Sequence, residues 1–373
     1  MALPHLFRDI VFRHSTNAPA HDVASFQAFL VSRPDVCRWI FNLSLLPERL
    51  ASVQAGLRWP PSFEVGAKLL ALLPNLHSLV LVHCSLVLLT DPVDISLRIP
   101  SLTLIGDADS LVLWRSLRCF TSVGRLCAHV RQGTELTLAP PHDGLTTHLQ
   151  IHTLVLLDID LCNEFLAGLF HGSLSPSLRS LSIDMDLHFL QRAADAIHRI
   201  LRLLSNNLEE LRYRFTPPGY NFGTCHVIKT NPTLANIYTE HMFEGLSWDQ
   251  LTTLTFDFHI VKSHNETRKQ LLRVSTFLHH FTASPTLRCV SLTIRTNAAT
   301  IKPDESDLRF NLWPSGLLGI ERKLLAIPRL ERVYVQKNGH PLSGPERKLL
   351  ASMWWSLHDG GQLCFPDVHR FSP

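Results

Sequence analysis

Residues 76–86 read Leu76-His77-Ser78-Leu79-Val80-Leu81-Val82-His83-Cys84-Ser85-Leu86, which is an L-x-x-L-x-L-x-x-C-x-L string. Its L-x-L centre places leucines at alternate positions, as in a short strand with one buried face. Repetition of one string at intervals of about 20–50 residues indicates a repeat architecture rather than separate globular domains. The same centre, with Ile, Val, Phe or Tyr replacing Leu in some copies, recurs at residues 43–45, 102–104, 136–138, 154–156, 181–183, 211–213, 254–256, 290–292 and 333–335.

The residue at which the chain leaves several of these strands is Asn, Asp or Cys. Such side chains can bond the backbone groups exposed where a strand turns, and a leucine-rich repeat places Asn or Cys there. The sequence therefore predicts an α/β fold: a curved leucine-rich-repeat solenoid of irregular repeats, with parallel strands on the concave face and helices on the convex face. The residues at this turn position are Cys84, Asp107, Asp186, Asn297 and Asn338.

Helix-like segments separate the strands, and several of them end just before a proline. A further helix is expected at residues 343–357, where Ser343 and Glu346 form a capping box and Pro345 lies in the first turn. We expect a strand-helix lead-in at 1–35, the repeat array at 36–340, and a capping helix and tail at 341–373. The segments expected to be helical between the strands are 22–32, 64–73, 187–205, 266–281 and 317–326.

The composition excludes several classes of protein. Lys and Arg number 35 against 32 Asp and Glu, and charged residues make up only 18% of the 373 residues. We therefore expect neither a disordered polyelectrolyte nor a nucleic-acid partner, although residues 211–215 mix Arg with aromatics. The apolar run 69–89 contains Pro74 and Asn75, so no membrane span is expected. Eight scattered cysteines without a C-x-x-C pair indicate reduced thiols and an intracellular protein, cytoplasmic or nuclear.

Motifs for catalysis and cofactor binding are missing from the sequence. It contains no Gly-x-x-x-x-Gly-Lys-Ser/Thr, Gly-x-Gly-x-x-Gly or Gly-x-Ser-x-Gly segment. The close histidine pairs, 148 with 152 and 279 with 280, are not accompanied by Cys or carboxylate residues at zinc-site spacing. The Asp-x-Asp pairs at 107, 158 and 184 are explained as turn and helix-capping residues. We therefore expect no enzyme, no cofactor and no metal.

The N-terminal third carries a resemblance. Residues 2–12 read ALPHLFRDIVF, residues 25–30 read SFQAFL, Arg33-Pro34 follows, and residues 39–45 read WIFNLSL. This passage, with the 70–81 repeat, resembles the fungal F-box/leucine-rich-repeat-like proteins in the part that follows their F-box. The resemblance implies the substrate-recognition arm of an F-box (SCF-type) ubiquitin ligase receptor, which captures a protein substrate on its repeats while the F-box binds the Skp1 adaptor.

Three alternatives remain open. Residues 3–39 run from a Leu-Pro to a Val-Cys-x-x-Trp and could form a degenerate F-box, in which case Skp1 would bind; Pro34 interrupts the helix that an F-box needs there. The chain could instead be a leucine-rich-repeat scaffold unrelated to ubiquitin transfer. An enzyme in the long repeats after residue 215 is the third alternative, although no nucleophile-base pair stands out.

Residues between the buried positions of each strand would form the inner surface of the sheet. This surface is expected to be apolar in the N-terminal half and charged in the C-terminal half. Arg, Tyr and Trp supply most of the binding energy at protein interfaces. The residues expected to bind a protein partner on the concave face are Arg212, Arg214, Asp257, Arg295, Arg332 and Tyr334.

Overall fold

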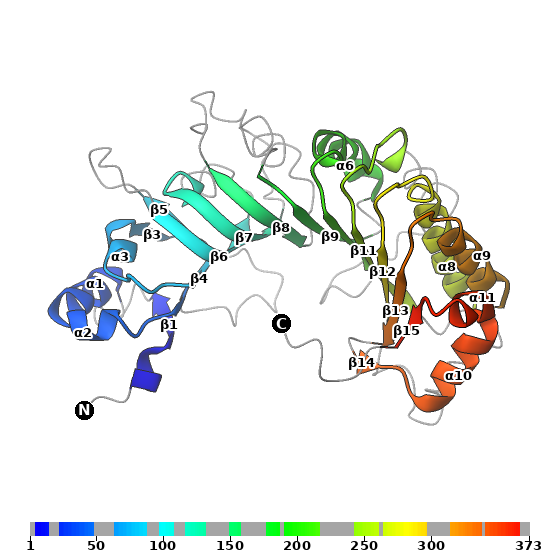
Figure 1. Ribbon diagram of the computed structural model, residues 1–373. Coiled ribbons are helices and arrows are strands. Elements are labelled where there is room, and N and C mark those ends of the chain that lie inside the picture. Colours follow the sequence, from blue (N-terminus) through cyan, green and yellow to red (C-terminus); the bar gives the residue numbers. More distant parts are fainter. Residues whose placement is uncertain are drawn as a thin grey trace. The chain divides into compact units, whose positions relative to one another are not determined.

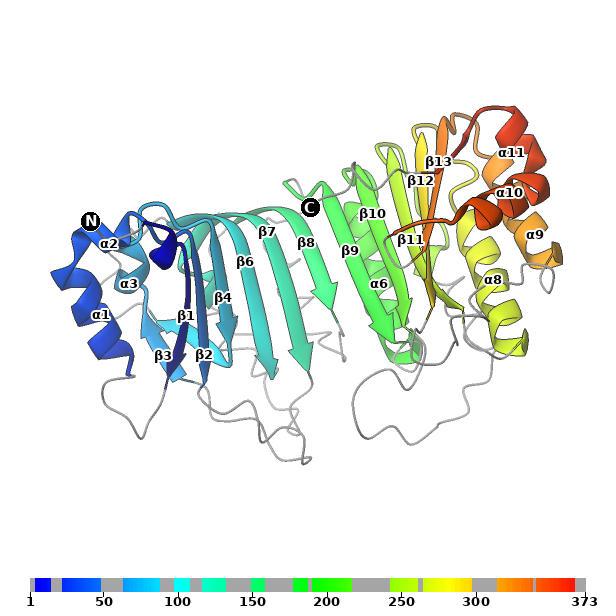
Figure 2. The same cartoon turned by 90° about the horizontal axis from the view of Figure 1, so that it is seen from below.

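The protein is an α/β structure with a long, mostly parallel sheet of 13 strands in sequential order (Figures 1 and 2). The chain divides into two compact units, Met1–Leu178 and Arg179–Pro373. This division falls inside the array expected at 36–340. The computed structural model describes residues 4–14, 22–47, 63–87, 97–107, 116–131, 149–157, 177–186, 190–216, 242–260, 264–296, 314–337 and 340–365.

Parallel strands form the frame of the first unit. The predicted L-x-L centres stand side by side, because Leu79 lies opposite both Leu43 and Leu102 in the ladder. All three leucines are buried, so the strand-forming role of the repeat is confirmed. The strands, in spatial order, are β1 (Asp9–His14), β2 (Asn42–Pro47), β4 (Ser78–Val82), β6 (Leu97–Asp107), β7 (Phe120–Arg131) and β8 (Gln150–Leu157).

Short helices precede and connect the first strands. After the 3-10 turn η1 (Pro4–Phe7), α1 (Val23–Ser32) confirms the predicted 22–32 helix: the Asp22 side chain accepts a 2.6 Å hydrogen bond from the Ser25 backbone N–H. Helix α2 (Pro34–Cys37) follows directly. Pro34 therefore starts a helix here, at the first position, where its missing N–H costs nothing.

The predicted helix at 64–73 is wrong over its first part. Residues Phe63–Gly66 form strand β3, which pairs in parallel with β5 (Cys84–Val87) in a separate two-stranded sheet. Only α3 (Lys68–Ala71) is helical. Val65 and Leu86 lie opposite each other in this small sheet and both are fully buried, so pairing between distant segments outweighs the local helix pattern.

Strand β7 has no L-x-L centre and was not predicted. Leu126 takes the first buried position, but Ala128 takes the second, and Gly124 interrupts the apolar pattern. Gly124 is required by a close approach, since a Cβ atom there would lie 2.7 Å from the Pro100 carbonyl oxygen on β6. The β6–β7 register also shifts between Leu97 and Arg98, as in a bulged ladder.

Replacing Gly124 with Ala is expected to lower the free energy of unfolding by about 1–3 kcal/mol, because the added methyl group pushes β6 and β7 apart. The matched control is Gly319→Ala on helix α9, where the added Cβ meets Ser275 Oγ at an ordinary 3.5 Å. The control is expected to be neutral or stabilising, because alanine favours helix. Urea unfolding followed by circular dichroism measures both. Equal stability of the Gly124→Ala and wild-type proteins would contradict the prediction.

The second unit repeats the parallel arrangement. Leu211 lies opposite Leu181 on one side and Leu254 on the other, and Val290 continues the row to Val333. All of these side chains are buried, which confirms the predicted C-terminal strands. The main strands are β9 (Ser180–Asp186), β10 (Glu210–Thr216), β11 (Thr253–Ile260), β12 (Cys289–Thr296) and β13 (Arg332–Lys337).

Three long helices lie on one side of these strands (Figure 1): α6 (Leu190–Leu204), α8 (His264–His279) and α9 (Pro314–Leu325). They confirm the helices predicted at 187–205, 266–281 and 317–326 to within a few residues. Phe277 of α8 lies at the centre of an aromatic cluster between helix and sheet, 4.5 Å from Phe256 and 4.8 Å from Phe243, measured between ring centroids. Tyr213 and Phe281 also contact it, at 5.3 and 5.0 Å.

Short elements close the free edge of β13. Strand β14 (His340–Pro341) pairs with it antiparallel, and β15 (Leu363–Cys364) pairs parallel at Val333 and Tyr334. Between them the capping box of Ser343 and Glu346 opens α10 (Gly344–Met353), as predicted. The helix expected at 343–357 is divided, however, because α11 (Trp355–Asp359) begins after Trp354, whose buried indole N–H donates to the Leu317 carbonyl.

Several expectations concern residues outside the described ranges. They include the repeat centre at 136–138, the turn residues Asn297 and Asn338, and His148. The side chains of Asp107 and Asp186 also lie outside the described part.

Candidate partner-binding face

The face of β9–β13 opposite helices α6, α8 and α9 carries a group of polar strand residues, and we call it the polar face. Strand alternation explains it: Leu211 and Tyr213 are buried toward the helices, while Arg212 and Arg214 point the other way. Its residues are Ser182, Asp184, Glu210, Arg212, Arg214, Thr253, Thr255, Asp257, Ser291, Thr293, Arg295, Arg332, Tyr334 and Gln336.

The strand register arranges these side chains in rows across the sheet. In one row, Ser, Thr and Tyr side chains flank an arginine. In the next row, two aspartates flank an arginine and are followed by Thr and Gln. The first row is Ser182, Arg212, Thr255, Ser291 and Tyr334, and the second is Asp184, Arg214, Asp257, Thr293 and Gln336.

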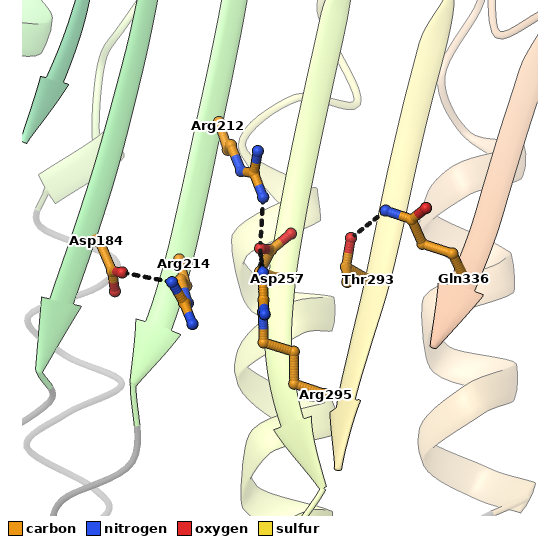
Figure 3. A network of polar contacts seen from close by, with 7 residues as sticks. All are labelled: Asp184, Arg212, Arg214, Asp257, Thr293, Arg295 and Gln336. Atoms are coloured by element: carbon orange, nitrogen blue, oxygen red, sulfur yellow. Dashed lines mark hydrogen bonds and ion pairs between the residues drawn. The ribbon is translucent and has the colours of Figure 1, made fainter. Parts of the chain in front are cut away.

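Asp257 on β11 is the centre of a charged network (Figure 3). Its Oδ2 atom accepts hydrogen bonds from Arg212 Nη2 at 2.8 Å and from Arg295 at 2.9 Å (Nη2) and 3.3 Å (Nε). The Asp257 side chain is 0% exposed, whereas those of Arg212 and Arg295 are 50% and 26% exposed. Two arginines on the neighbouring strands therefore compensate one buried carboxylate.

The electrostatics of Asp257 follow from this geometry. Burial alone disfavours the charged carboxylate and would raise its pKa, but the charges and hydrogen bonds of Arg212 and Arg295 outweigh burial, so the pKa lies below its usual value. Asp257 is therefore ionised at neutral pH. Its second oxygen, Oδ1, is buried and has no hydrogen-bond partner among the described residues, so the carboxylate depends on the two arginines.

Neighbouring pairs extend the network along the second row. Arg214 Nη1 donates to Asp184 Oδ2 at 2.8 Å, and Gln336 Nε2 donates to Thr293 Oγ1 at 2.9 Å (Figure 3). Both pairs bridge adjacent strands. They hold four side chains of β9, β10, β12 and β13 in fixed positions beside Asp257.

Arg332 and Tyr334 stand apart from this network, on β13. Arg332 is exposed, and its Nη1 donates to the Tyr334 hydroxyl oxygen at 3.3 Å. Tyr334 is half-buried and lies in the same row as Arg212, separated from it by Thr255 and Ser291. The remaining predicted residues, Arg212, Arg214, Asp257 and Arg295, lie together on adjacent strands.

Asp184, Thr293 and Gln336 take part in the bonding but were not among the candidate residues. Sequence alternation places each of them on the polar face. The signal that identifies Asp184 is its register: it lies opposite Arg214, which lies opposite Asp257. A charged residue opposite its counter-charge on a neighbouring strand is expected to form an ion pair.

Several described cysteines have thiols that burial makes less reactive at neutral pH. Burial raises the pKa of Cys119 to about 11 and also raises that of Cys127 and Cys289. In the ranges given above, no group of three or more His, Cys, Asp or Glu side chains could hold a metal ion. No helix in the described part of the chain is both long and apolar enough to cross a membrane.

A depression of about 450 Å³ lies in the first unit, at the start of β6 and β7. Two of its polar groups are engaged within the protein: Asn75 Nδ2 donates to the Arg38 carbonyl oxygen, and His77 Nδ1 lies 2.7 Å from the Asn75 carbonyl oxygen. The rest of the lining is Pro74, Leu76, Arg98, Ile99, Pro100, Ser122 and Gly124. It contains no charged cluster comparable to the Asp257 network.

Comparison with known proteins adds no family assignment. No protein-family model matches the chain. A search of curated proteins gave no match.

Proposed function

We propose that the chain is a non-catalytic protein-binding module, a leucine-rich-repeat solenoid that captures a protein partner on the polar face. The observation that carries this proposal is the Asp257 network. It holds Arg212 and Arg295 in place while about half of the Arg212 side chain and about a quarter of the Arg295 side chain stay exposed. An arginine fixed in this way loses little conformational entropy when a partner binds it.

The composition of the face supports binding. Arginine and tyrosine are the side chains that concentrate binding energy at protein interfaces, and both occur here within a surface of Ser and Thr hydroxyls. The resemblance at the N-terminus extends the proposal: the module would serve as the substrate-recognition arm of an F-box ubiquitin ligase receptor. The alternative is a leucine-rich-repeat scaffold unrelated to ubiquitin transfer.

Site-specific photo-crosslinking tests the proposal. Benzoylphenylalanine replaces Ser291, in the row between Arg212 and Tyr334, and in a control protein it replaces Arg268, which is exposed on α8. After irradiation in native cell extract, we expect a discrete crosslinked protein from position 291 and none of that mass from position 268. Equal crosslinking at both positions, or none at 291, would reject the polar face as a binding surface.

The same crosslinked material distinguishes the two versions of the function. Immunoblotting for the Skp1 adaptor is expected to detect it in complexes if the chain acts in a ubiquitin ligase. Its absence from complexes that contain a crosslinked partner would favour the scaffold.

A further inference from the structure

Opposite charges lie at different depths on the polar face. It carries the guanidinium groups of Arg212, Arg214, Arg295 and Arg332 and the carboxylates of Asp184, Glu210 and Asp257. Asp184 and Asp257 are buried and only Glu210 of these carboxylates is exposed, whereas Arg212 and Arg332 are exposed and Arg214 and Arg295 are partly exposed. A macromolecule that approaches this face therefore meets more positive than negative charge.

We propose that the partner presents a segment rich in Asp and Glu, and that Arg212 and Arg332 bind its carboxylates. This inference rests on the proposed function and names the chemistry of the partner. Guanidinium groups bind carboxylates through strong, charge-assisted hydrogen bonds. Complementary charge is the feature that selects one partner over others at such a surface.

Arg212 is positioned for this role by Asp257. Its Nη2 donates to Asp257 Oδ2 at 2.8 Å, and this bond ties one side of the guanidinium to the sheet. Within the described part of the chain, Nε and Nη1 of Arg212 make no hydrogen bond, which leaves them for a ligand. The side chain is half exposed, and Arg295 holds the same Asp257 oxygen from the other side, so Asp257 acts as a positioning residue beneath the contact surface.

Arg332 provides the second contact. Its register neighbour across the sheet is Cys289, and its guanidinium is held toward the Tyr334 hydroxyl. Arg332 lies three strands from Arg212 and two residues earlier in the register, in the row of Cys289, Thr253 and Glu210, so the two backbone positions are about 16 Å apart at the usual strand spacing and rise. Thr255 and Ser291, which separate Arg212 from Tyr334, are short and carry hydroxyl groups. An extended peptide advances about 14 Å in four residues, and the long arginine side chains span the remaining distance, so carboxylates four residues apart match the two arginines.

A nucleic acid fits this face less well than an acidic peptide does. Tight nucleic-acid binding requires basic residues that neutralise a continuous series of phosphates. Here exposed Glu210 lies two residues before Arg212 on the same strand, and the chain as a whole carries a formal charge of only +3. Two separated arginines match discrete carboxylates better than a phosphate backbone.

Fluorescence anisotropy with labelled octaglutamate at low salt tests this inference on the full chain. Arg332→Gln is expected to weaken binding about tenfold, because it removes a charged donor. Glu210→Gln is expected to strengthen binding several-fold, since it removes a like charge beside Arg212. Arg268→Gln on α8 is the matched control and is expected to leave the affinity unchanged. Thermal melting of each variant excludes loss of folding.

Several outcomes would overturn the inference: octaglutamate does not bind, the Arg332→Gln variant binds it as well as the control does, or labelled oligothymidylate binds more tightly than octaglutamate. Failure of the proposed function itself is separate. If benzoylphenylalanine at 291 still crosslinks a protein but octaglutamate does not bind, the face binds proteins by other contacts. In that case only the acidic-partner inference fails.

Discussion

In a protein carrying both Arg212→Ala and Arg295→Ala, the Asp257 carboxyl group is expected to destabilise the fold increasingly as the pH rises. In the wild type the same group stabilises the fold as the pH rises. In the wild type the two arginines hold the pKa of Asp257 below its usual value. Its contribution to stability is therefore present above the unfolded-state pKa of about 4 and is lost as the pH falls through the folded-state value.

Removal of both arginines leaves burial as the dominant effect on Asp257, and burial raises the pKa of a carboxyl group. The folded state then favours the neutral acid, so the contribution of Asp257 to stability is greatest below about pH 4 and falls as the pH rises through the new folded-state value. At neutral pH the uncompensated buried charge is expected to cost about 3–5 kcal/mol.

Urea unfolding at a series of pH values measures the effect. Adding Asp257→Asn to the double variant removes the charge, and part of the lost stability at neutral pH is expected to return. Asp257→Asn alone leaves Arg212 and Arg295 with solvent access, so it should cost less than the double replacement. Parallel pH profiles of the double variant and the wild type would show that Asp257 does not depend on its arginines.

Replacing Phe277 with Ala is expected to destabilise the second unit by about 3–5 kcal/mol, because it empties the centre of a fully buried aromatic cluster. Its ring lies within 5.3 Å of the rings of Tyr213, Phe243, Phe256 and Phe281. Aromatic pairs at such distances add stabilisation beyond the area they bury.

Leu272→Ala on the same helix is the control, since Leu272 is 53% exposed. It is expected to change stability by less than about 1 kcal/mol, because little apolar area is lost. Chemical unfolding followed by tyrosine and tryptophan fluorescence compares the two variants. Comparable losses from both replacements would contradict the placement of Phe277 at the centre of the core.

The strands could be predicted because their signal is local. Each L-x-L centre buries two side chains on one face, and the parallel register aligns Leu79 with Leu43 and Leu102 as the repeat requires. Strand β7 escaped prediction because Ala128 replaces the second leucine. The helix expected at 64–73 failed because β3 is stabilised by pairing with β5, a contact between segments that no local pattern reveals.

For the candidate residues, the sequence predicts on which face of the sheet each side chain lies, but not how deeply it is buried. Alternation along a strand places Arg212 and Asp257 on the polar face. The burial of each side chain depends on which residues the neighbouring strands place over it. Asp257 was expected on the surface together with the arginines, and it is instead covered, at 0% exposure. Its role as their anchor depends on the register between β10, β11 and β12.

The pairing of β15 with β13 has a consequence for self-association. The unpaired backbone N–H and C=O groups of an edge strand can form hydrogen bonds with a strand of another chain, and such pairing often initiates aggregation. At Val333 and Tyr334 the returning segment occupies that edge: the Val333 N–H donates to the Gln362 carbonyl oxygen. Another copy of the chain that meets β13 there finds those backbone groups already bonded, so the sheet cannot be extended at this point by adding a foreign strand.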